Sequence, residues 1–129
     1  MISYQELKVR LSASTFRSRF KLDTQGRRYA LEKGPEQILF QAKQILRTRL
    51  GAAEPVNDGK QTPMRGHVVF TAQHATGSCC RGCLEKWHHI PRHRPLTQEE
   101  ISAVAHVITQ WIFEQTLLEE NISYTPDLL

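Results

Sequence analysis

The sequence predicts an all-α protein, a single compact domain of four or five helices with a long polar loop between the second and third main helices. Three observations predict this fold class. A length of 129 residues suits one domain with one hydrophobic core. Hydrophobic residues make up 40% and charged residues 23%, which excludes collagen-like, wholly disordered and disulfide-scaffold chains. Apolar residues recur at helical spacing over two long stretches, residues 35–50 and 98–119.

Two short helical segments are expected at the front of the chain. Ser3 and Glu6 have the spacing of a capping box and predict an opening helix. Ser14 predicts a second start, and one helical turn after it would place the rings of Phe16 and Phe20 on one face. These segments are expected to cap the main helices.

The clearest helix of the first half is predicted over residues 35–50, after a turn at residues 23–26. Pro35 suits the first position of a helix and Gly51 suits its end. Residues 52–66 then lose all periodicity and contain an Asn-Asp-Gly turn, which predicts the long polar loop. Such a turn can present backbone N–H groups to an anion.

The closing helix is predicted over residues 98–119. Thr97 and Glu100 form a second capping box in front of an apolar stripe that begins at Ile101. The main helices, including one expected near residues 68–90, would pack around Trp87 and Trp111. The domain would span residues 1–120, and residues 121–129 are expected to form a loose C-terminal tail.

Charge is distributed unevenly along the chain. Residues 1–50 carry eleven Lys or Arg against four Asp or Glu, whereas residues 96–129 carry none against six. A basic front could neutralise the phosphates of a polyanion. It could equally be a solvated face that the acidic closing helix balances, and both interpretations stay open.

The remaining composition predicts a cytoplasmic protein without membrane segments. The longest apolar stretches are far shorter than the roughly 20 residues that cross a bilayer. The chain starts without a basic stretch and apolar run, so no signal peptide is expected. Three cysteines, two of them adjacent, make a poor disulfide framework.

Residues 67–90 hold all three cysteines and four of the six histidines, and two geometries compete for them. The favoured one is a single helix, with or without a kink at Gly77, in which Cys80 and Cys83 join an apolar face. Its polar face would carry histidines and an arginine seven residues apart, namely His67, His74, Arg81 and His88. In this geometry no metal is needed.

The alternative geometry is a local metal knot. Cys80-x2-Cys83-x4-His88-x4-His93 has the spacing of a zinc knuckle. The fallback ligand set is Cys79, Cys80, Cys83 and His88, and the ion would be zinc or iron. No cofactor is favoured by the first geometry, and zinc is the leading ion of the second.

Candidate catalytic residues are His67 and His74, because both lie beside the polar loop. There Lys60 and Arg65 could hold an anion while an imidazole moves a proton. Structural hydrogen bonding by the two histidines is the competing interpretation. The candidate anion-binding residues as a set are Arg17, Arg19, Lys60, Gln61, Arg65 and Arg81.

Four motifs give the chain a family resemblance: FRSRFKL at 16–22, NDGKQTPMRGH at 57–67, AQHAT at 72–76 and CCRGCLEKWH at 79–88. Together they resemble the bacterial domain-of-unknown-function family 4186, over roughly residues 10–115. The resemblance implies a small bacterial, cytoplasmic protein and brings no established reaction. The family pattern often has histidines at the positions of Lys21 and Gln41, so a metal or proton role there would be altered in this chain.

The sequence is compatible with three candidate functions. The leading one is a polyanion-binding module for nucleic acid or a nucleotide, or another phosphate-bearing ligand. The second is a zinc- or iron-binding protein, or a metal-dependent enzyme, built on the cysteine cluster. The third is a protein interaction module without a ligand. Signatures of hydrolases, deaminases and dinucleotide enzymes are absent, so the sequence leaves both enzymatic activity and the oligomeric state open.

Overall fold

The computed structural model describes residues 2–57 and 59–124, with only the backbone described for residues 118–124. Within these ranges the chain forms six helices and no strand, so the prediction of an all-α fold is confirmed. The helices, in chain order, are α1 Tyr4–Ser12, α2 Thr15–Ser18, α3 Thr24–Leu50, α4 Val68–Thr76, α5 Arg81–His88 and α6 Gln98–Tyr124.

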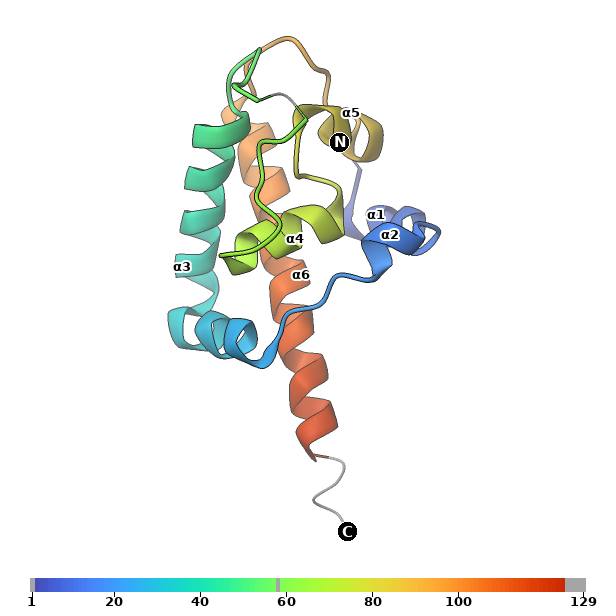
Figure 1. Cartoon of the computed structure of the whole chain (residues 1–129), viewed down its shortest axis with the longest axis vertical. Helices are drawn as coiled ribbons and strands as arrows, with labels where there is room; N and C mark the ends of the chain where they lie inside the picture. The colour runs from blue at the N-terminus through green and yellow to red at the C-terminus, as the bar shows by residue number, and fades with distance from the viewer. Residues whose placement is uncertain (1, 58, 125–129) are drawn as a thin grey trace.

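The two long helices, α3 and α6, lie side by side and form the main interface (Figure 1). The shorter α4 packs on both of them, and its apolar face closes the core. Because the facing side chains are aliphatic and recur every three or four residues, each helix buries one stripe. The fully buried members of this core include Ile38, Ala42, Leu46, Val69, Ala72, Ala105, Ile108 and Ile112.

Both predicted helix starts at the front of the chain are confirmed. The Ser3 hydroxyl accepts a hydrogen bond from the backbone N–H of Glu6 at 3.2 Å, and Ser14 accepts one from Arg17 at 3.2 Å. Such side-chain acceptors satisfy donors that a helix leaves unpaired at its first turn. Helix α1 buries Leu7 and Leu11 in a small second cluster beside α6.

Helix α3 starts earlier than the sequence predicted, and the turn expected at residues 23–26 is wrong. The Asp23 carboxylate accepts a hydrogen bond from Gly26 N–H at 2.7 Å and so caps a helix that begins at Thr24. Gly34 then takes φ 83°, which kinks the helix immediately before Pro35. Pro35 therefore starts the second segment of α3, and Gly51 ends it as predicted.

The single helix expected at residues 68–90 is also wrong. Helix α4 ends at Thr76, and Gly77 adopts the left-handed conformation with φ 70° and ψ 33°. A Cβ atom on Gly77 would lie 2.7 Å from the ring of Trp87, so the turn requires glycine both for its backbone and for its space. Cys80 then caps a new helix, α5.

The two tryptophans lie at the edges of the core rather than at its centre. Trp111 is partly buried against the main core and Trp87 against the small cluster around Leu7. The core between the long helices is aliphatic, so the expectation that the helices pack around these rings is corrected.

Helix α6 starts as predicted and ends later. Thr97 and Glu100 form the expected capping box, with N–H to side-chain distances of 2.9 and 3.1 Å. The backbone of residues 121–124, expected to be tail, continues α6, and residues 125–129 lie outside the described residues. No helix in the described ranges combines the length and the apolar character needed to cross a bilayer.

Candidate metal centre

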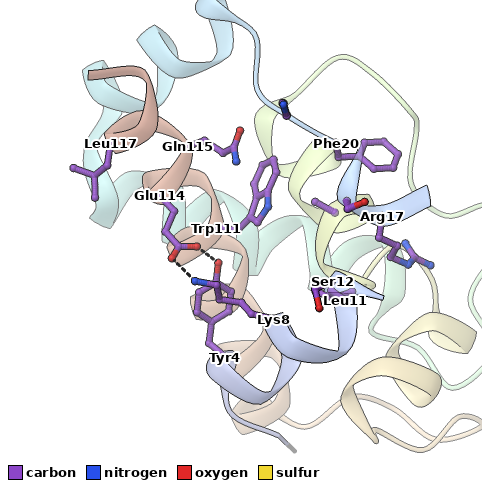
Figure 2. A pocket seen from close by; sticks show the side chains of 13 residues that line it. Tyr4, Lys8, Leu11, Ser12, Arg17, Phe20, Trp111, Glu114, Gln115 and Leu117 are labelled. Atoms are coloured by element: carbon purple, nitrogen blue, oxygen red, sulfur yellow. Dashed lines mark hydrogen bonds and ion pairs between the residues drawn. The ribbon is translucent and has the colours of Figure 1, made fainter. Parts of the chain in front are cut away.

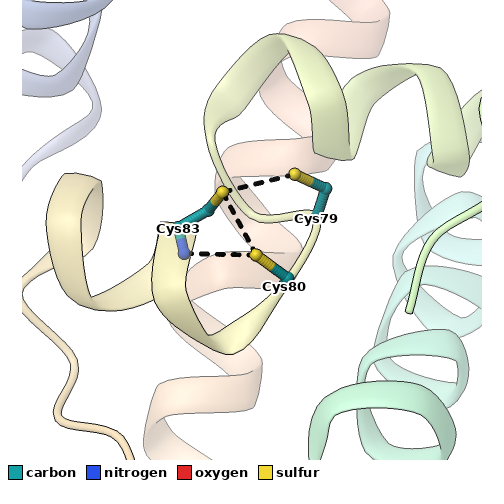
Figure 3. A group of neighbouring side chains, drawn as sticks. All are labelled: Cys79, Cys80 and Cys83. Carbon is teal, nitrogen blue, oxygen red and sulfur yellow. Dashed lines mark hydrogen bonds between the residues drawn. The ribbon is translucent and has the colours of Figure 1, made fainter. Parts of the chain in front are cut away.

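The turn between α4 and α5 brings the three cysteines together (Figure 3). The Cys83 Sγ lies 3.5 Å from the Cys79 Sγ and 3.3 Å from the Cys80 Sγ. All three sulfur atoms lie within 4.8 Å of one another, and each cysteine is partly exposed. The cluster is therefore compact, and part of each cysteine is accessible to solvent.

Local backbone geometry explains why the sulfurs meet. Cys80 is the N-cap of α5, and its Sγ accepts a hydrogen bond from the backbone N–H of Cys83 at 3.4 Å. The first turn of a helix carries the side chain three residues on back toward the cap, which places Cys83 beside Cys80. Cys79 is fixed from the polar loop, because the Thr62 hydroxyl donates to its carbonyl at 2.7 Å.

Arg17 reaches the cluster from α2. Its Nη2 donates to the Cys83 Sγ at 3.1 Å, and its Nη1 lies 3.7 Å from the Cys79 Sγ. The same Nη1 donates to the His74 carbonyl at 2.7 Å, and the guanidinium lies over the ring of Trp87. The sequence predicted that Arg17 binds the anion of a ligand. In the structure its guanidinium instead contacts two thiols of the protein itself.

Hydrogen bonds among the thiols separate their acidities. Hydrogen bonds with the Cys79 and Cys83 side chains, and then with the backbone N–H groups at the start of α5, lower the pKa of Cys80 far below its usual range. The pKa of Cys79 is raised, first by its hydrogen bonds to Cys80 and Cys83 and then by burial. The backbone N–H of Cys83, which points at the Cys80 sulfur, also favours negative charge there.

The spacing of the sulfurs fits a thiolate-bound metal ion. Tetrahedral zinc with Zn–S bonds of about 2.3 Å places its sulfur ligands ~3.8 Å apart. The Sγ–Sγ distances of 3.3 and 3.5 Å would need only small adjustments to reach that value. Thiolates are ligands that zinc, iron and Cu(I) all accept. Cys79, Cys80 and Cys83 are thus a cluster that could hold a metal.

His88, the fourth member of the fallback ligand set, is not in this cluster. It is buried at the other end of α5, where its Nε2 hydrogen-bonds to the Thr76 carbonyl at 2.8 Å. Burial lowers the pKa of His88 to about 4, so the ring is neutral and its Nε2–H donates to this carbonyl. His88 therefore lies outside the cluster, and the fallback ligand set is corrected to the three cysteines, which could hold a metal.

The two candidate catalytic histidines take part in the fold and share no partner in the described contacts. His67 caps α4, since its Nδ1 accepts from Val69 N–H at 3.0 Å. It lines a cleft of about 770 Å³ together with Lys21 and Arg65, and burial lowers its pKa. These contacts support the structural interpretation of His67, and its catalytic role stays a prediction.

His74 contacts different groups. Its Nε2 hydrogen-bonds to the Pro63 carbonyl at 3.1 Å, and its ring stacks on Phe20 at 5.5 Å between centroids. His74 thus ties the polar loop to α4 and is not among the residues that line the cleft at His67. A shared proton-transfer site of the two histidines gains no support from this placement.

Three of the six predicted anion-binding residues face into the protein. Arg81, expected on a polar face, is 1% exposed and donates to the backbone carbonyls of Leu50, Ala52, Pro91 and Arg94. Gln61 is buried and its side chain accepts from Gly59 N–H, and Arg17 contacts the thiols. Arg19, Lys60 and Arg65 are exposed.

A second hollow lies between the front helices and α6 (Figure 2). It has a volume of about 530 Å³, and its lining includes Phe20, Trp111 and Arg17. At its edge Glu114 accepts hydrogen bonds from Tyr4 and Lys8 (Figure 2), and burial, followed by this bond, raises the Tyr4 pKa. No local sequence pattern indicates this hollow, because its walls come mostly from opposite ends of the chain.

Comparison with known proteins identifies the family of the chain. A family model described as "Domain of unknown function (DUF4186)" matches residues 5–113. No solved structure matches the chain.

Proposed function

The chain belongs to the DUF4186 family of domains of unknown function, and within that family we propose that it is a zinc-binding protein. The thiolates of Cys79, Cys80 and Cys83 would hold the ion. The observation that carries the proposal is the approach of all three sulfur atoms to within 4.8 Å of one another. The family description names no activity, so the function rests on the chemistry of this cluster.

The charges around the cluster support a bound divalent ion. Three thiolates and one Zn²⁺ carry a net charge of −1. Arg17 supplies a single positive charge at hydrogen-bond distance from two of the sulfurs. The backbone N–H groups at the start of α5 point toward the Cys80 sulfur and favour negative charge there. The loaded centre would therefore be close to neutral.

The number of protein ligands bears on what the ion would do. Structural zinc sites have four protein ligands, whereas catalytic sites have three and leave one position for water or substrate. A bound zinc ion would supply Lewis-acid chemistry at that position. The role of this chain would be to orient three thiolates and to place Arg17 beside them, where a small anionic ligand would also be favoured.

Metal analysis tests the proposal directly. Protein reconstituted with zinc under reducing, oxygen-free conditions should retain one equivalent after desalting. Cobalt substitution should give the sulfur-to-metal charge-transfer absorption of a thiolate site. Cys83→Ser should lose both signals, because Cys83 is the sulfur that contacts the other two.

Two histidine variants serve as matched controls. His88→Gln and His93→Ala remove the histidines of the knuckle spacing, and both should keep one equivalent of zinc, with circular dichroism confirming that they fold. Wild-type protein that retains no metal would refute the proposal. A loss of zinc in folded His88→Gln would restore the four-ligand set.

Polyanion binding is a second candidate, favoured by the cleft at His67. Lys21 and Arg65 line this cleft beside the rings of Phe20 and Tyr29, a combination that suits a phosphate-bearing ligand with an aromatic base. Fluorescence anisotropy with labelled single-stranded DNA should show affinity that falls as salt rises, and Arg65→Ala should reduce the salt slope by about one. Binding that is absent at low salt, or unchanged in Arg65→Ala, would reject this candidate.

A further inference from the structure

Two of the three sulfurs stand in a Cys-x-x-Cys arrangement at the start of a helix. Cys80 is the N-cap of α5 and Cys83 lies in its first turn, with the Sγ atoms 3.3 Å apart. A disulfide bond requires a sulfur–sulfur distance of about 2.0 Å. The pair would close by a movement of roughly 1.3 Å, which side-chain rotation within one helical turn can supply.

The two sulfurs have different hydrogen-bond partners, which indicates different chemical roles for them. Cys80 accepts a hydrogen bond from the Cys83 backbone N–H at 3.4 Å, so the helix start stabilises negative charge on its sulfur. Cys83 has the Arg17 guanidinium at 3.1 Å. Both side chains are partly exposed, so a small disulfide can approach them.

We propose that the metal-free protein carries out thiol–disulfide exchange with low-molecular-weight disulfides, with Cys80 as the attacking sulfur and Cys83 as the resolving sulfur. This activity goes beyond zinc binding and requires only two of the three thiols. Cys79 is the less suited partner. Its sulfur lies farther from Cys83, at 3.5 Å, and no backbone N–H donates to it in the described contacts.

The reaction proceeds in two balanced steps. The Cys80 thiolate attacks one sulfur of a disulfide RS–SR, forms a Cys80–S–SR bond and releases RS⁻, which takes a proton from water. Cys83 loses its proton to water, and its sulfur attacks the Cys80 sulfur, which breaks the mixed disulfide and releases the second RS⁻. One disulfide is reduced to two thiols, and two protein thiols are oxidised to the Cys80–Cys83 disulfide.

Arg17 favours the second step. Its charge beside Cys83 stabilises the thiolate that must form there before resolution can occur. The same step consumes two of the proposed zinc ligands, so zinc binding and the Cys80–Cys83 disulfide exclude each other. Zinc should therefore slow the exchange when added in excess.

The test uses the full chain, freed of metal with a chelator, reduced and mixed with oxidised glutathione. Samples are alkylated over time and mapped by mass spectrometry of peptides. Wild-type protein should form the Cys80–Cys83 disulfide with Cys79 alkylated. Cys83→Ser should stop at a glutathione adduct on Cys80, and Cys80→Ser should react at least tenfold more slowly.

His93→Ala changes an exposed side chain outside the thiol cluster, so it is the matched control and should keep the wild-type rate. Cys80→Ser is expected to fold, because serine is itself a good N-cap residue. A glutathione adduct on Cys79 in Cys83→Ser, a wild-type rate in Cys80→Ser, or no disulfide in wild-type protein would each overturn the proposal. Zinc content measured on the same samples reports separately on the proposed function.

Discussion

Replacement of Gly77 by alanine tests the account of how the thiol cluster forms. Gly77 ends α4 with φ 70°, a conformation that an L side chain disfavours by about 1–2 kcal/mol. The added Cβ would also lie 2.7 Å from the Cδ1 and Cγ atoms of Trp87 and 2.9 Å from its Cβ. Overpacking of this kind costs about 1–3 kcal/mol. Gly77→Ala should therefore destabilise the fold by roughly 2–5 kcal/mol.

A double-mutant cycle separates the two contributions. The free energy of unfolding is measured with urea for wild type, Gly77→Ala, Trp87→Ala and the double variant. Trp87→Ala removes the two closest contacts with the new methyl group and keeps the Cβ contact at 2.9 Å. Alanine at residue 77 should then cost less than in wild type, while its cost should still exceed the backbone contribution of about 1–2 kcal/mol. An equal cost of Gly77→Ala in both backgrounds would refute the steric argument.

Three further outcomes are expected. Arg81→Met should destabilise the fold by roughly 2–5 kcal/mol in urea unfolding, because four backbone carbonyls lose a buried donor, whereas exposed Arg65→Met should change stability by less than about 0.5 kcal/mol. The lowered pKa of His88, from 6.5 to about 4, means that the unfolded chain takes up the proton first as pH falls. The contribution of His88 to the free energy of unfolding is complete above pH 6.5 and should decline by about 3 kcal/mol as the pH falls to 4. Urea unfolding at a series of pH values should show that this decline is absent in His88→Gln. Zinc at 100 times its dissociation constant should stabilise wild type by about 2.7 kcal/mol in thermal unfolding, with no effect on Cys83→Ser or after chelation.

Helix starts could be predicted because the interactions that fix them are local. The caps at Ser3, Ser14 and Thr97 each join a side chain to a backbone group three residues away. The α-helical stripes of α3 and α6 follow from the spacing of aliphatic residues for the same reason. A prediction from residue spacing is most secure where the deciding contacts lie within one or two turns.

The break at Gly77 could not be predicted in this way. Apolar residues keep a helical period on both sides of it, so the pattern reads as one helix. The ring that fills the space beside Gly77 belongs to Trp87, ten residues further on. Once the helix divides, the Cys80 and Cys83 sulfurs move from an expected core face to a cap and its first turn.

Long-range contacts also determine which partners the charged site residues have. Arg81 has carbonyl partners up to 31 residues away, and Arg17 meets Cys83 across 66 residues. Neither pairing can be read from the local composition, and both arginines were therefore predicted to be anion-binding residues. The family resemblance did identify the segments that meet at the cluster, because its motifs include Arg17, Thr62 and the three cysteines.

The front of the chain contacts the rest of the protein largely through polar side chains. These contacts affect the surroundings of the cysteine sulfurs. Arg10 donates to the carbonyls of Lys86 and Trp87, Lys8 to Glu114, and Arg17 to His74, while few apolar side chains are buried there. Segments held in this way open at lower free energy than a packed core. Opening of residues 2–20 would withdraw the Arg17 guanidinium from the Cys79 and Cys83 sulfurs, so hydrogen exchange should be faster in these residues than in the buried segments of α3 and α6.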